Sequence, residues 1–191
     1  MTMTKTRSLA ALAGLSLLLA ACGGSTTDSA ADKFARTAEE QAKTQKAPAE
    51  TPAPTATKIT PTAAERDLSK KPKIPKSSGA APTQLKVEDL VVGNGAAAKT
   101  GDKVAVRYVG VLYDNNKEFD ASWNRGKAPF ELTLGAGQVI AGWDQGLLGM
   151  KVGGRRKLTI PPDQAYGAQG QPPTIPKNAT LVFEVDLTKI G

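Results

Sequence analysis

Five side chains in the second half of the chain could together form a binding site. Phe119 and Asp120 lie in "KEFDAS", Phe130 follows a proline, Trp143 lies in "GQVIAGWDQGL", and Tyr166 lies in "DQAYGAQG". Each aromatic residue alone could belong to an ordinary core. Together they exceed what one thin layer of packing needs, so they favour an apolar pocket with a few polar groups at its rim.

Trp143 lies in a stretch that combines helical spacing with glycines. Val139, Ile140, Trp143 and Leu147 recur at helical intervals, which is typical of one apolar helix face. Two glycines interrupt the stretch, and each costs about 1 kcal/mol relative to alanine in a helix. A large aromatic side chain in such a weak helix indicates packing or a binding site. The pattern predicts one short helix over residues 138–148.

The chain from Leu85 onwards alternates apolar and polar residues between turns. "KVAVRYVGVL" and "TLVFEVDLTKI" have the period-two pattern of strands with one apolar face. Shorter strand-like runs are "LKVEDLVV", "PFELTL" and "RRKLTIP". Such a sheet needs a cover, and residues 138–148 provide the one good helix. The sequence therefore predicts an α+β fold, an antiparallel sheet of five to six strands wrapped on one short helix.

Several motifs of this region occur together in one known family. "FD", "VIAGWDQGL", "AYG" and "ATLVFEV" follow one another in this order. The chain from about Leu85 to Gly191 therefore resembles the FKBP-type peptidyl-prolyl cis-trans isomerases, the macrolide-binding immunophilins. The resemblance implies an FKBP-like fold and a pocket that takes proline-containing peptides and macrolide ligands.

The resemblance also implies a role for each candidate site residue. Trp143 would form the floor of the pocket, and Asp120 would be the buried polar group near the prolyl amide. The hydroxyl of Tyr166 and the backbone N–H of Ile140 would donate hydrogen bonds to substrate carbonyls. The apolar lining would consist of Tyr108, Phe119, Phe130, Val139, Ile140, Ile175 and Phe183.

Two residues depart from the usual pattern of the family. Gln138 stands where members often carry an acidic residue that binds macrolides, and Gln171 stands where the best-known members have histidine. The segment between Phe119 and Phe130 is one residue longer than in the shortest members. These changes concern macrolide affinity and substrate preference more than the basic activity.

The chemistry of such a site requires no nucleophile. Rotation about a peptide bond has a barrier of about 18 to 20 kcal/mol, and the twisted transition state has lost the polarity of the planar amide. A dry aromatic cavity therefore favours the transition state. The chain has no histidine and one cysteine, so we expect neither a metal nor another cofactor. Asp120 is not expected to act as a general base, because no proton needs to move.

The N-terminus has the pattern of an export signal. Two basic residues precede an apolar run of 13 residues from Leu9 to Ala21, which is shorter than the roughly 20 that a membrane span needs. The run ends in "LAAC", which resembles the lipobox of bacterial lipoproteins. Residues 1–21 are therefore predicted to be a lipoprotein signal peptide and Cys22 the lipidated residue. The alternative is an ordinary secretory signal in which Cys22 is incidental.

Residues 22–84 are predicted to be a lipid anchor followed by a disordered linker. The segment is rich in Pro, Ala, Thr and Lys and poor in large apolar residues, so burial cannot offset the entropy lost on ordering. A short helix over residues 30–46 is an alternative for part of it. The net charge of +7 is spread along the chain, which does not favour nucleic-acid binding.

The sequence thus favours a peptidyl-prolyl cis-trans isomerase in residues 85–191 that assists the folding of exported proteins. We expect an extracytoplasmic monomer, lipid-anchored to the outer face of the cytoplasmic membrane, with proline-containing exported polypeptides as substrates. One alternative is a non-catalytic module that binds proline segments as a chaperone or envelope scaffold. Another is a purely structural sheet domain.

Overall fold

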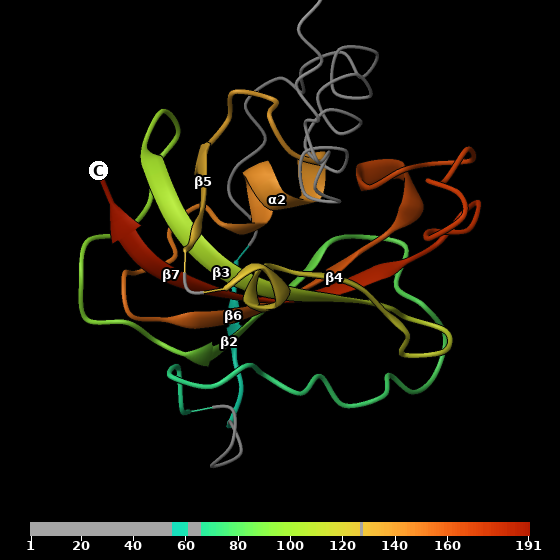
Figure 1. The fold of residues 1–191 in the computed structure, drawn as a ribbon, viewed down its shortest axis with the longest axis horizontal. Helices are drawn as coiled ribbons and strands as arrows, with labels where there is room; N and C mark the ends of the chain where they lie inside the picture. Colours follow the sequence, from blue (N-terminus) through green and yellow to red (C-terminus); the bar gives the residue numbers. More distant parts are fainter. Residues whose placement is uncertain (1–54, 61–65, 127) are drawn as a thin grey trace, which may run out of the picture.

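The computed structural model describes residues 55–60, 66–126 and 128–191 (Figure 1). The predicted signal peptide, Cys22 and the first part of the predicted linker lie outside the described residues, as does the alternative helix over residues 30–46. Within the described ranges, no helix has the length and apolar character needed to cross a membrane.

A seven-stranded sheet forms the framework of the described residues. Its order is β1-β2-β6-β7-β3-β4, and β5 pairs with β3 beside this path. The pair β1 and β2 is parallel, whereas the other pairs are antiparallel. The strands are β1 (Thr57–Lys58), β2 (Lys86–Val91), β3 (Lys103–Leu112), β4 (Glu118–Ala121), β5 (Phe130–Thr133), β6 (Arg155–Ile160) and β7 (Leu181–Ile190).

A short helix, α2 (Ala141–Gly146), packs on one face of the sheet (Figure 1). The α+β architecture expected from the sequence is confirmed. The helix is shorter than predicted, because the backbone at Ile140 is extended, with ψ of 147°, and Gly149 beyond its end has a φ of 73°. Two 3-10 helices, η1 (Ser122–Arg125) and η2 (Pro162–Gln164), follow β4 and β6.

The main core lies between α2 and the sheet. Leu158 and Ile160 of β6 are fully buried there. A Cβ atom added at Gly142 would collide with the side chain of Ile160, and one at Gly146 with that of Leu158. The two glycines that weaken the helix therefore allow α2 to lie close to β6.

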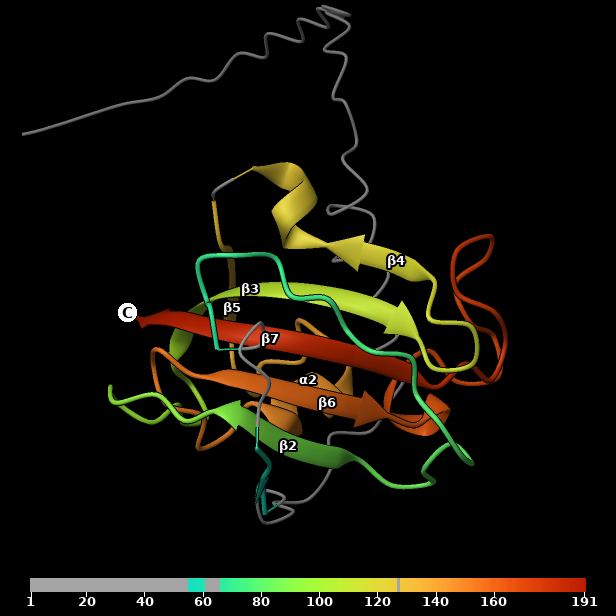
Figure 2. The ribbon, with the colours of Figure 1, turned by 90° about the horizontal axis from the view of Figure 1, so that it is seen from below.

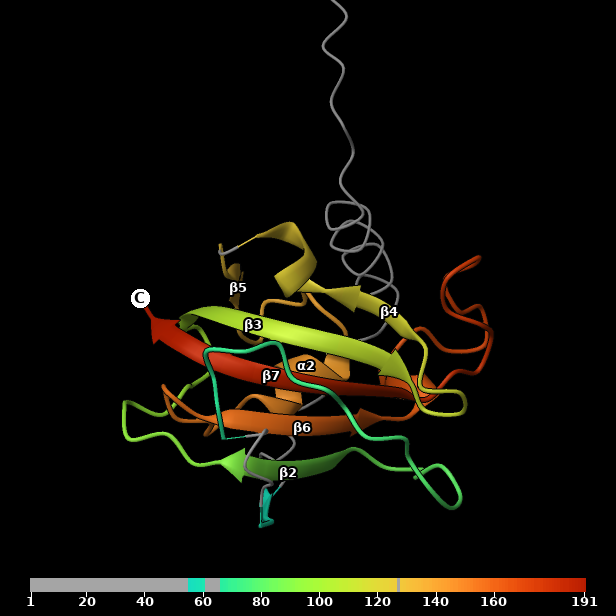
Figure 3. The same cartoon turned by 60° about the horizontal axis from the view of Figure 1, so that its bottom comes forward.

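Residues 66–84 form a strap across the face of the sheet opposite to α2 (Figures 2 and 3). Pro72 and Ile74 of the strap are buried, whereas Lys71 and Lys73 are exposed. Ile74 belongs to a second apolar cluster, whose other buried members are Val109, Val111, Ala121 and Val182. The strap thus covers a face of the sheet that would otherwise expose valines.

The strap differs from the disordered linker that the sequence predicts for residues 22–84. That prediction used average composition, which hides a period-two run in "KKPKIPK" with Pro72 and Ile74 on one side. Further along the chain towards the N-terminus, β1 pairs with β2 and brings the sheet to seven strands rather than five or six. The folded unit therefore begins before Leu85.

Candidate functional site

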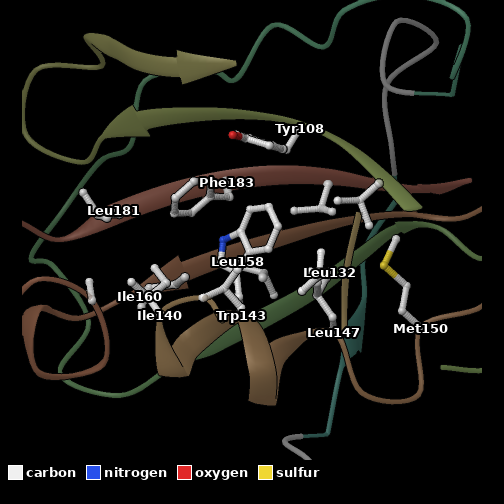
Figure 4. Packing of buried hydrophobic residues seen from close by; sticks show 14 of the residues in the cluster. Tyr108, Leu132, Ile140, Trp143, Leu147, Met150, Leu158, Ile160, Leu181 and Phe183 are labelled. Carbon is white, nitrogen blue, oxygen red and sulfur yellow. The ribbon is translucent and has the colours of Figure 1, made fainter. Parts of the chain in front are cut away.

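Trp143 lies at the centre of an aromatic cluster between α2 and the sheet (Figure 4). Its ring centroid is 5.1 Å from that of Tyr108 and 5.2 Å from that of Phe183, and both contacts are edge-to-face. Phe130 meets Trp143 edge-on at 6.4 Å, and Phe119 meets Phe183 at 5.4 Å. Such contacts contribute about 0.5–1.5 kcal/mol each beyond burial. Together they fix the orientation of the Trp143 indole.

The structure brings the ten site residues predicted from the sequence into one region. Nine of them belong to the main apolar cluster or pack against it, and Asp120 reaches this cluster through Tyr108. Tyr108 lies on β3, Phe119 and Asp120 on β4, Phe130 on β5, Val139 and Ile140 before α2, Trp143 in α2, Tyr166 and Ile175 between β6 and β7, and Phe183 on β7. Their placement agrees with one shared site, while the role of each residue stays a prediction.

The site has a buried floor and a partly exposed rim. Trp143 is 2% exposed and Tyr166 is 4% exposed, whereas Phe119, Asp120 and Phe130 are partly exposed. Two cavities of about 350 and 340 Å³ lie elsewhere, one beside the end of β7 and one under the strap, and neither is lined by these residues. The rim residues are therefore the part of the site that solvent reaches.

The polar part of the site is a closed network of three side chains. The Tyr108 hydroxyl donates to Oδ2 of Asp120 at 2.5 Å. Arg125 donates from Nη1 to Oδ1 of Asp120 at 2.6 Å and from Nη2 to the Tyr108 hydroxyl at 2.7 Å. The Arg125 guanidinium also lies 5.5 Å from the centre of the Tyr108 ring. Each group fixes the other two, so the carboxylate is oriented and its charge is paired.

Arg125 is a site residue that the sequence analysis did not identify. It lies at the end of η1, five residues after Asp120, and this separation has no periodic pattern that would indicate a contact. The available signal was an opposite charge close to Asp120, in a loop followed by a glycine. A turn of 3-10 helix brings the guanidinium back over β4 and β3.

Burial keeps the two tyrosine hydroxyls of the site protonated. It raises the pKa of Tyr108 well above the ordinary value, and the neighbouring Asp120 carboxylate raises it further. Burial likewise raises the pKa of Tyr166 well above its ordinary value. Both hydroxyls are therefore hydrogen-bond donors throughout the neutral pH range.

Two further donors lie at the start and in the first turn of α2. The backbone N–H of Ile140 and the indole Nε1 of Trp143 make no hydrogen bond with another described residue. The Ile140 carbonyl is already used, because it accepts the backbone N–H of Trp143 at 2.9 Å. The site thus offers N–H groups beside an apolar floor, which suits a ligand with carbonyl oxygens.

Asp144 holds the turn that leads into the site. Its carboxylate accepts the backbone N–H of Gly135 at 2.9 Å and that of Gly137 at 3.1 Å. Burial raises the pKa of Asp144, while these two hydrogen bonds oppose the shift. Oε1 of Gln138 accepts the backbone N–H of Thr133 at 2.8 Å. These contacts fix the backbone immediately before the residues that line the site.

Within the described residues, no side chains of the site are arranged for nucleophilic catalysis or for holding a metal ion. No group of three or more His, Cys, Asp or Glu side chains there could hold a metal ion. The carboxylate of Asp120 is engaged with Arg125 and Tyr108. What the site can do is bind an apolar group over Trp143 and hold adjacent carbonyls by hydrogen bonds.

Residues 94–188 match the family model of the FKBP-type peptidyl-prolyl cis-trans isomerases. The chain is 49% identical to an FK506-binding protein of Streptomyces anulatus over 121 residues, which is 63% of this chain and 97% of that protein. It is 48% identical to a probable FK506-binding protein of Corynebacterium glutamicum over 61% of this chain and 96% of that protein.

Longer relatives and a solved structure match the same region. The 39 kDa FK506-binding nuclear protein of Drosophila melanogaster is 56% identical over 56% of this chain, but the chain spans 29% of the length of that relative. The crystal structure of AtFKBP13 is similar with a TM-score of 0.53 and 38% identity, covering 58% of this chain and 96% of that one.

Proposed function

The chain belongs to the FKBP-type peptidyl-prolyl cis-trans isomerases, and from this premise we propose that it accelerates the cis-trans isomerisation of X-Pro bonds in exported proteins. Its setting is the outer face of the cytoplasmic membrane, to which a lipid on Cys22 anchors it. Exported chains begin to fold with mixed prolyl isomers, and their interconversion takes tens of seconds without a catalyst.

The observation that carries this proposal is the position of Trp143. Its indole forms an apolar floor held by Tyr108, Phe130 and Phe183, and a proline ring is an apolar group of suitable size for such a surface. The N–H of Ile140 lies beside this floor and has no partner among the described residues. A peptide bound here places its proline on the indole and a carbonyl oxygen near Ile140.

Catalysis in this site follows from desolvation and from orientation of the substrate. The planar amide is stabilised by charge separation between its oxygen and nitrogen, and water favours that polar form. The aromatic surroundings remove this advantage and favour the twisted amide. The Tyr108–Asp120–Arg125 network keeps a partly buried, paired charge beside the bound peptide and transfers no proton.

The membrane setting rests on the sequence pattern at the N-terminus. Residues 1–21 have the charge and length of an export signal, and "LAAC" places the one cysteine of the chain at the position that lipidation requires. Acyl chains contribute about 0.8 kcal/mol for each buried methylene, so more than one chain on Cys22 gives firm anchoring.

FK506-type macrolides are proposed as ligands of the same site. The relatives named FK506-binding proteins support this class of ligand. Gln138 stands where members often carry an acidic residue, and its Oε1 is already engaged by the Thr133 N–H. We therefore expect weaker macrolide binding than in members with a free carboxylate at this position.

The experiment that tests the function is exchange spectroscopy on a Leu-Pro peptide with the full chain. An isomerase used in catalytic amounts produces exchange between the cis and trans signals. A non-catalytic module that binds proline segments shifts the signals only at stoichiometric amounts, and that outcome would contradict the proposed activity. A structural domain produces neither effect.

A further inference from the structure

The strap lies against the segment that carries two members of the polar network. Nζ of Lys71 donates to Oε1 of Glu118 at 2.8 Å and to Oδ1 of Asn124 at 2.9 Å. Nδ2 of Asn124 donates to the same Glu118 oxygen at 3.0 Å. Glu118 opens β4 two residues before Asp120, and Asn124 directly precedes Arg125. Lys71 therefore connects both ends of the β4–η1 segment.

The strap itself is held firmly enough to support such a connection. Arg155 donates from Nη2 to the Lys70 carbonyl at 3.3 Å, and Asn116 donates from Nδ2 to the Ile74 carbonyl at 3.1 Å. The Tyr113 hydroxyl lies 3.1 Å from the carbonyl oxygens of Ser78 and Ala80. Because Pro72 and Pro75 restrict the backbone, few contacts are needed to fix the strap.

Apolar packing joins the strap to the same segment. Ile74 is 4% exposed and shares its cluster with Ala121, the last residue of β4, while Trp123 of η1 packs against that cluster. Among the described residues β4 pairs with one strand, β3, and its outer side meets no second strand from this part of the chain. The strap supplies support that a second neighbouring strand would otherwise give.

We propose that the strap is a positioning element of the isomerase site, in which Lys71 holds Glu118 and Asn124 so that Asp120 and Arg125 meet Tyr108. This inference rests on the proposed isomerase function for its catalytic consequence. Lys71 touches neither Trp143 nor the polar network itself, and it acts through β4 and η1. The catalytic domain accordingly includes residues on the N-terminal side of Leu85.

The test compares Lys71→Met with Lys73→Met in the full chain. Both changes remove one exposed lysine charge from the strap, but the Lys73 side chain makes no hydrogen bond or ion pair with another described residue. We expect Lys71→Met to slow catalysed exchange about two- to fivefold, the fold-change that corresponds to losing a partly exposed ion pair. Lys73→Met should have the wild-type rate of catalysed exchange, and Lys71→Arg should keep most of that rate.

A double-mutant cycle separates positioning from general stability. In an Arg125→Lys background the fixed guanidinium is absent, so Lys71→Met should cause little further loss. A merely structural contribution would instead lower the rate by the same factor in both backgrounds. That additive result, or an equal loss from Lys73→Met, would overturn the proposal.

A readout that does not depend on activity completes the design. The Arg125 guanidinium N–H signals should be resolved in NMR spectra of the wild type and Lys73→Met, because Asp120 and Tyr108 accept their hydrogen bonds. They should broaden in Lys71→Met. Unchanged Arg125 signals in Lys71→Met would overturn the strap proposal. Absence of catalysed exchange in the wild type would instead overturn the proposed function, and the two failures are thus distinguishable.

Discussion

At the scale of single residues, Trp143 combines a core position with its predicted role as the floor of the site. Its ring meets three other aromatic rings edge-to-face, yet its indole N–H has no hydrogen-bond partner among the described residues. The edge-to-face contacts hold the indole in one orientation, so that it can serve as a rigid apolar surface.

Replacing Trp143 should separate these two tasks. Trp143→Ala should lower the free energy of unfolding by about 3–5 kcal/mol, because a large buried aromatic side chain is lost. Trp143→Leu should keep the chain folded while impairing catalysed exchange. Urea unfolding and exchange spectroscopy measure the two effects. If Trp143→Ala left stability and exchange unchanged, the assignment of the pocket floor would be wrong.

The buried hydroxyl of Tyr108 predicts how stability depends on pH. Burial and the Asp120 carboxylate raise its pKa in the folded chain above the unfolded value of about 10. The stability that the buried, protonated hydroxyl contributes is fully present below pH 10. It is lost as the pH rises from 10 towards the pKa of the folded chain. For one such group the free energy of unfolding falls by about 1.4 kcal/mol per pH unit above 10.

The prediction is tested with Tyr108→Phe, and Tyr113→Phe is the control that removes a tyrosine hydroxyl outside the site. The free energy of unfolding in urea is measured at several alkaline pH values. Tyr166 has a raised pKa for the same reason, so the wild type should lose stability steeply. Tyr108→Phe should lose it about half as steeply, since one of the two hydroxyls is gone. Equal slopes for the wild type and Tyr108→Phe would contradict the link between Tyr108 burial and stability.

At the scale of elements, α2 depends on glycines for its close approach to the sheet. Gly142→Ala would favour the isolated helix by about 1 kcal/mol, but the added methyl group collides with Ile160. We expect a net destabilisation of about 1–3 kcal/mol. Ile160→Ala, which removes the colliding Cγ2 atom, should be less destabilising in the Gly142→Ala chain than in the wild type. A Gly142→Ala chain that is more stable than the wild type would contradict the packing of α2 on β6.

The elements also show where prediction from the sequence succeeded. Period-two patterns identified β3 and β7, because alternate residues of each strand belong to the main core cluster. The spacing around Trp143 identified α2, although glycine and extended backbone at Ile140 shorten it. The aromatic residues that the motifs indicated lie together around Trp143, and their roles in a site stay predictions.

Arg125 and the strap were missed for different physical reasons. Arg125 reaches Asp120 through a turn of 3-10 helix, and no repeat in the sequence indicates that contact. The strap has too few apolar residues to order itself, and the valines that Ile74 packs against belong to strands far along the chain. The composition of a segment does not indicate a contact with strands that are distant in the sequence.

At the scale of the whole molecule, the site and the strap occupy opposite faces of one sheet (Figures 2 and 3). Residues 66–84 therefore pass behind the sheet, away from the floor of the site. This arrangement leaves the rim formed by Phe119, Asp120 and Phe130 uncovered by the strap. The proposed substrate would then bind on the face opposite to the strap.

The anchor is tested by Cys22→Ala, expressed in a bacterial host that processes lipoproteins. We expect the wild-type chain in the membrane fraction with a lipidated N-terminal cysteine, because "LAAC" precedes the cleavage point. Cys22→Ala should give an uncleaved precursor or a released protein, with exchange activity preserved in the folded domain. Wild-type protein that is wholly soluble and unacylated by mass spectrometry would exclude the anchor.

The central claim is that an aromatic site isomerises prolyl bonds without moving a proton, and the rate of catalysed exchange as a function of pH tests it most directly. The measurement is magnetisation transfer on one Leu-Pro peptide with the full chain between about pH 6 and 8.5, with and without EDTA. General acid-base catalysis gives a bell-shaped profile, whereas tyrosine and aspartate ordinarily titrate near 10 and 4. We predict a nearly flat profile that EDTA does not change, and a moderate decrease in Asp120→Asn. No acceleration of exchange, a sharp inflection near neutral pH, or loss of activity in EDTA would contradict the account.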